Sequence, residues 1–137
     1  MDLQLNSLKA ASGEILDGTA TLTLNKDIKG KAVVATLYAQ TQGVLGKELS
    51  QPESFPYSKS QTLDTERLYT SQGGPYRYKF SLVMPQVEAI ETILDKFPEF
   101  TYETLRWFVL VELKHDAMLS LPISKTQEIR IVKKPLA

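Results

Sequence analysis

Hydrophobic and polar residues alternate along much of the chain, and the clearest run begins at Tyr76. Large apolar side chains occupy every second position of this run: Tyr76, Tyr78, Phe80, Leu82 and Met84. Arg77, Lys79 and Ser81 lie between them. A period of two places these sets on opposite faces of a β-strand, one buried and one solvated. Pro85 ends the run, because proline cannot donate a hydrogen bond to a neighbouring strand.

The same alternation predicts further strands along the chain. The segments that show it are residues 16–24, 33–39, 104–114 and 128–132, and shorter strands are expected at 3–5, 62–69 and 118–123. Seven or eight short strands separated by turn signals are typical of an all-β sandwich or barrel, and we expect a two-sheet antiparallel β-sandwich. We expect residues 1–137 to form one such domain and residues 42–61 to form a long loop or an irregular edge.

The segment from Thr104 to Lys114 is apolar on both faces near its middle, because Phe108 and Leu110 fall out of phase with its main apolar set. A strand of this kind should be covered on both sides. One short helix is predicted at residues 86–97, since its apolar positions are three, four and three residues apart. A helix this short needs a sheet to pack on. We favour packing over Phe108 and Leu110; the alternative is that both surfaces meet a partner.

Composition narrows the classes of function. Sixteen basic and sixteen acidic residues cancel, so nucleic-acid binding by counterion release is not expected. The absence of cysteine removes disulfides, thiol chemistry and zinc–thiolate sites. The first residues lack the pattern of a signal peptide, and no apolar run reaches the ~18 residues that span a bilayer. We therefore expect a cytoplasmic protein with no integral membrane segment.

Candidate catalytic and metal-binding residues are few. The single histidine, His115, precedes Asp116, and the pair could suggest a general base. Its place after one apolar strand and before Met118 favours a hairpin turn instead. Three acidic residues run along the predicted helix at spacings that could gather a cation, although a solvated helix face explains them better: Glu88, Glu91 and Asp95. We predict no catalytic residue, no metal site and no cofactor.

Glycine supplies two local signals. Asp17-Gly18 between apolar alternations could mark a hairpin or a bulge within one long strand. Gly73-Gly74-Pro75 predicts a turn leading into the strand at Tyr76. Neither belongs to a phosphate-binding loop, because the sequence contains no GxGxxG or GxxxxGK pattern.

The order of these motifs resembles the N-terminal sandwich of the arrestin-like family. Five segments carry the resemblance: a Gly-Glu-apolar opening at residues 13–22, an apolar strand after a short basic turn at 28–39, an aromatic and apolar strand ended by proline at 75–85, and the last long strands at 105–113 and 129–132. The resemblance implies a β-sandwich of the immunoglobulin or arrestin-like type. Members of that family usually carry two sandwiches, whereas this chain is expected to form one. It also offers no counterpart of the paired lysines and buried polar core with which visual and β-arrestins sense receptor phosphates. The resemblance implies a non-enzymatic adaptor or scaffold.

The predicted function is therefore a non-catalytic protein-interaction module for an unknown protein partner, with a homodimer through a sheet edge or face as one form of association. The predicted partner-binding residues are Arg77, Lys79, Phe108 and Leu110. The alternative is a ligand-binding sandwich for carbohydrate or lipid. It rests on four aromatic residues that the pattern does not place in the core: Tyr38, Phe55, Tyr57 and Tyr69.

Overall fold

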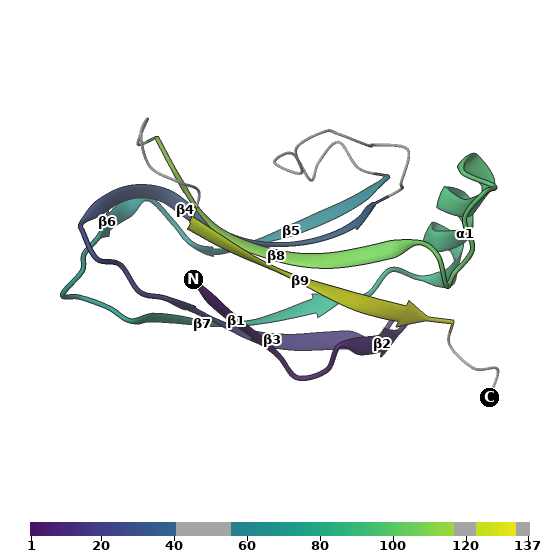
Figure 1. Cartoon of the computed structure of the whole chain (residues 1–137), viewed down its shortest axis with the longest axis horizontal. Helices are drawn as coiled ribbons and strands as arrows, with labels where there is room; N and C mark the ends of the chain where they lie inside the picture. The colour runs from purple at the N-terminus through teal and green to yellow at the C-terminus, as the bar shows by residue number, and fades with distance from the viewer. Residues whose placement is uncertain (41–55, 117–122, 134–137) are drawn as a thin grey trace.

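The computed structural model describes residues 1–40, 56–116 and 123–133, which form two stacked β-sheets and one helix (Figure 1). One sheet has three strands in the order β1-β3-β7, and the other has six in the order β2-β9-β8-β4-β5, with β6 also paired to β4. The strands are β1 (Asp2–Leu5), β2 (Lys9–Ala11), β3 (Ile15–Leu22), β4 (Ile28–Gln40), β5 (Tyr57–Asp64), β6 (Arg67–Tyr69), β7 (Tyr76–Val83), β8 (Arg106–His115) and β9 (Ile123–Val132); the helix is α1 (Val87–Lys96). The predicted all-β sandwich is confirmed.

The structure corrects the predicted strand number and pairing. The described residues hold nine strands rather than seven or eight, because β2 was missed and residues 62–69 divide between β5 and β6. One pairing, β2 with β9, is parallel, whereas all the others are antiparallel. Only residues 6–8 separate β1 from β2, so the chain passes from the smaller sheet to the edge of the larger one.

The core lies between the two sheets and contains the alternating apolar residues that the sequence indicated. Trp107 is 2% exposed, and its neighbours on the inner face of β8 are buried with it: Val109, Val111 and Leu113. The facing sheet contributes Leu16, Ala20, Leu22, Phe80 and Leu82. Burial of these side chains is the main favourable contribution to folding.

The helix occupies a different place from the predicted one. Ile90 and Ile93 are buried in the core between the sheets, and α1 lies at one end of the sandwich (Figure 1). Phe108 and Leu110 belong to a separate small cluster with Tyr38 on the outer face of the six-stranded sheet. The prediction that α1 covers them is therefore wrong. Only residues 84–86 link α1 to β7, so it begins at the end of the smaller sheet.

Local predictions had mixed outcomes. Asp17-Gly18 lies inside β3, where its pairing with β7 is regular, so it is neither a hairpin nor a bulge. The turn before Tyr76 is confirmed. The predicted loop at 42–61 is wrong from Tyr57 onward, because β5 begins there; residues 42–55 lie outside the described residues, as does most of the strand expected at 118–123.

Candidate functional site

The outer face of the three-stranded sheet is the candidate site. On β3, residues alternate between the core and solvent, and those that point outward are matched across the sheet by outward residues of β1 and β7. We define the outer face by these residues: Asp2, Gln4 and Asn6 on or next to β1, Ile15, Asp17, Thr19 and Thr21 on β3, and Arg77, Lys79, Ser81 and Val83 on β7. The face therefore depends on an uninterrupted period of two along each strand.

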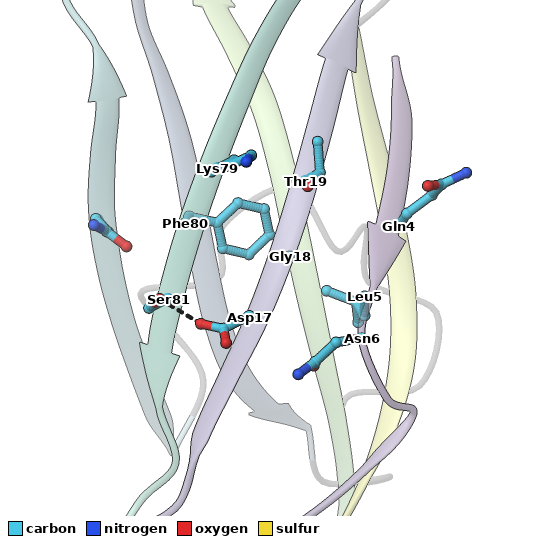
Figure 2. A pocket seen from close by; sticks show the side chains of 10 residues that line it. Gln4, Leu5, Asn6, Asp17, Gly18, Thr19, Lys79, Phe80 and Ser81 are labelled. Carbon is cyan, nitrogen blue, oxygen red and sulfur yellow. Dashed lines mark hydrogen bonds between the residues drawn. The ribbon is translucent and has the colours of Figure 1, made fainter.

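A concavity of about 650 Å³ opens on the outer face (Figure 2). Its lining includes the polar side chains of Gln4, Asn6, Thr19 and Lys79. The Ser81 hydroxyl donates a hydrogen bond to the Asp17 carboxylate, which Figure 2 shows across the gap between β7 and β3. The concavity therefore presents both donors and acceptors, as a surface that recognises a polar chain requires.

The floor of the concavity depends on glycine. Gly18 faces the core between Leu5 and Phe80, and a Cβ atom at this position would lie 2.4 Å from Phe80 Cζ and 2.9 Å from Leu5 Cδ2. Both separations are well below ordinary carbon–carbon contact. Only a residue without a side chain lets the Phe80 ring pass beneath β3.

Two cations lie on β7 at the edge of the outer face, whereas the carboxylates of the face, Asp2 and Asp17, lie on β1 and β3. Arg77 and Lys79 are exposed, and neither forms an ion pair within the part of the chain that the structure describes. Elsewhere cations do have partners: Lys31 Nζ lies 2.9 Å from Asp116 Oδ2. Unpaired, solvated cations are available to a negatively charged partner and attract it over about a Debye length.

An apolar pair ends the outer face near α1. Ile15 is 60% exposed and Val83 is 47% exposed, and the two are direct cross-strand partners. Their exposure next to the polar concavity adds apolar area to the outer face, and protein interfaces combine apolar and polar area. Sequence reasoning missed both residues, although the alternation contained the signal: each is an apolar residue at an outward position.

β7 is an edge strand that is fixed to the other sheet at one end. The Tyr78 hydroxyl donates a 2.7 Å hydrogen bond to Asp64 Oδ2 on β5. Burial raises the pKa of Tyr78, and the Asp64 carboxylate raises it further, so this phenol stays neutral. The hydrogen bond fixes the position of β7 and leaves its outer edge without a neighbouring strand among the described residues.

The structure separates the four predicted partner-binding residues. Arg77 and Lys79 lie on the outer face of the smaller sheet, whereas Phe108 and Leu110 lie on the opposite outer face, on β8. Phe108 is 9% exposed, stacks on Tyr38 with ring centroids 5.4 Å apart and carries the Arg106 guanidinium 5.2 Å from its ring. The four residues therefore do not form one docking surface.

Other candidates from the sequence also have defined places. His115 is the last residue of β8, in register with Gly30, and the rest of the predicted turn lies largely in residues 117–122, outside the described residues. Within residues 1–40, 56–116 and 123–133, no group of three or more acidic residues, histidines or cysteines could hold a metal ion. Tyr38 and Tyr69, two of the aromatic residues behind the ligand-binding alternative, are buried at 1% and 0% exposure, and Phe55 lies outside the described residues.

Comparisons with known proteins place the fold. No family model matches the chain, and no curated protein matches it in sequence. The crystal structure of Spo0M, a sporulation control protein from Bacillus subtilis, matches 95% of this chain with a TM-score of 0.56 and 16% identity. The fold is arrestin-like. The chain spans 47% of the length of Spo0M, about half, and at this identity the likeness concerns the fold alone. In the described part of the chain, no helix has the length and apolar character needed to cross a membrane.

Proposed function

We propose that this chain is a non-catalytic, cytoplasmic protein-interaction module of the arrestin-like family, and that it docks its partner on the outer face of the three-stranded sheet. The observation that carries the proposal is the combination on one face of unpaired Arg77 and Lys79, the 650 Å³ polar concavity and the exposed Ile15–Val83 pair. Protein interfaces combine exposed apolar area with charges that select the partner.

The similarity of the fold to that of Spo0M supports this proposal. Spo0M is a sporulation control protein, and the match between the two folds favours a regulatory adaptor over an enzyme. The position of the site supports it as well. The outer face lies on regular strands held by the shared core, and a rigid surface of this kind binds without a large ordering cost.

Affinity capture with charge-reversed variants tests the proposal. The tagged chain and its Arg77→Glu/Lys79→Glu variant would be compared in extracts of the native host. Lys114→Glu is the matched control, because Lys114 is an exposed lysine on β8 of the other sheet. We expect proteins captured by the wild type and the control to be lost from the double variant. Capture of the same proteins by all three chains would refute docking on this face.

Self-association belongs to the proposal as a separate prediction, because open sheet edges can add a strand from a second copy. Light scattering coupled to size exclusion measures it directly. A mass of twice 15.4 kDa supports a homodimer, and a mass of 15.4 kDa at all concentrations contradicts it.

A further inference from the structure

A lateral cavity lies between the two sheets, at the side where each ends in an edge strand. β5 ends the six-stranded sheet and β7 ends the three-stranded one. The two strands are neighbours in space, joined by the Tyr78–Asp64 hydrogen bond. Beyond that bond a cavity of about 250 Å³ opens between them, lined by residues of both sheets: Leu37, Lys59, Ser60, Gln61, Ser81, Leu82 and Val83. This lateral cavity therefore lies beside two strand edges that pair with no other strand of the described residues.

The lateral cavity is apolar at its base and cationic at its rim. Leu37 and Leu82 are core residues at 1% and 6% exposure. Lys59 on β5 is exposed and, like Arg77 and Lys79, forms no ion pair among the described residues. A cavity of roughly 150 Å³ with apolar walls is enough to hold benzene, so this one has room for an aliphatic side chain.

We propose, building on the proposed function, that the edge of β7 binds an extended segment of the partner in which apolar and acidic residues alternate. An added strand would pair with the free N–H and C=O groups of β7. Its side chains would then alternate as those of β7 do, with one set on the outer face and the other directed to the core side. Those beside Arg77 and Lys79 would be acidic, and those directed to the core side would be apolar and enter the lateral cavity.

Charge favours an acidic partner segment over a second copy of this chain at this edge. A second β7 strand contains no acidic residue, so it would supply no partner for Arg77 and Lys79, and any register that set these cations directly opposite those of the other copy would be destabilising. An acidic segment instead supplies a partner for each cation. Lys59 on β5 and Lys79 on β7 also protect the free edge from non-specific strand addition, as charged residues on edge strands commonly do.

Synthetic peptides of eight residues, the length of β7, test this inference by fluorescence anisotropy. One peptide alternates valine with glutamate, a second alternates valine with lysine and a third alternates serine with glutamate. We expect the valine–glutamate peptide to bind at least about tenfold more tightly than either of the others. The affinity of this peptide should decrease as the salt concentration is raised from about 0.1 M to about 1 M.

Three variants connect the binding to the site. Arg77→Glu/Lys79→Glu should lose the valine–glutamate peptide and gain the valine–lysine one. Gln61→Trp replaces an exposed residue that lines the lateral cavity and should block binding by filling it. Lys114→Glu on the other sheet should leave binding unchanged. Thermal unfolding of each variant shows whether a loss of binding reflects a loss of fold.

Three outcomes of the peptide and variant experiments would overturn the inference. Equal affinity for the glutamate and lysine peptides would contradict the charge selection, and no binding of any peptide would contradict strand addition. A concentration-dependent dimer of the wild type that Arg77→Glu/Lys79→Glu abolishes would assign the edge to a second copy. The proposed function is judged separately, because the capture experiment depends on the outer face and on no peptide.

Discussion

Substitution of Gly18 by alanine tests the close contact between β3, which forms the floor of the concavity, and the Phe80 ring in the core. The added Cβ atom would lie 2.4 Å from Phe80 Cζ, over 1 Å closer than the ~3.5 Å of ordinary carbon–carbon contact. Overpacking of this kind costs about 1–3 kcal/mol. Replacing a strand glycine by alanine gains about 0.5–1 kcal/mol in backbone entropy, so we expect a net loss of about 1 kcal/mol, within a range of about 0–2.5 kcal/mol.

A double-mutant cycle with Phe80→Leu separates the clash from other effects of alanine. Phe80→Leu shortens the side chain that meets the new Cβ atom, so Gly18→Ala should cost less in that background, with a coupling energy above about 0.5 kcal/mol. Urea unfolding followed by fluorescence of Trp107, the single tryptophan, measures both variants. An unchanged or raised stability of Gly18→Ala, or additive effects within about 0.3 kcal/mol, would refute the close contact.

Three further variants or conditions probe other parts of the molecule. Phe108→Asp should reduce stability by at least about 3 kcal/mol, because it places a charge in the buried Tyr38 cluster, and an unchanged urea midpoint would disprove it. Tyr78→Phe should cost about 1 kcal/mol by removing the hydrogen bond to Asp64, and an equal cost in an Asp64→Ala background, which has no acceptor, would contradict that cause. Burial raises the pKa of Tyr69 from 10.0 to about 12, so the folded state holds its proton longer than the unfolded state and stability should fall as pH rises from 10 towards 12; titration of the phenol at its ordinary pKa in the folded protein, followed by absorbance, would show the opposite.

The sequence was informative wherever one face of a strand is buried. The period of two from Tyr76 to Met84 predicted β7, its inner side chains and the exposure of Arg77 and Lys79. The same period predicted the inner face of β8, and apolar spacings of three and four residues predicted the short helix. These features follow from local periodicity, which needs no knowledge of the partner strands.

Features that depend on distant contacts could not be predicted in this way. Nothing in the spacing of α1 shows that Ile90 and Ile93 enter the core between the sheets rather than covering Phe108. β2 has three residues, too few for a periodic signal, and its parallel pairing with β9 depends on the other end of the chain. The regular pairing of Gly18 depends on Phe80, sixty-two positions later in the sequence.

The candidate site shows the same division. Arg77 and Lys79 were identified because an alternating strand has an outward set, and Phe108 and Leu110 because they broke the phase. The alternation of residues does not show which sheet each strand joins. The pair Arg77 and Lys79 is separated from the pair Phe108 and Leu110 because β7 and β8 belong to different sheets. The edge position of β7 and the lateral cavity beside β5 follow from strand order alone.

Amide hydrogen exchange of the complex recovered by affinity capture tests the central claim most directly, namely that a partner docks along β7. In the free chain, the β7 amides of residues 76–83 that point away from β3 should exchange readily, because no strand covers that edge in the described structure. Bound partner should slow exchange along 76–83 and leave β8 unchanged. Unaltered exchange along 76–83 in a complex that retains its partner would contradict the account.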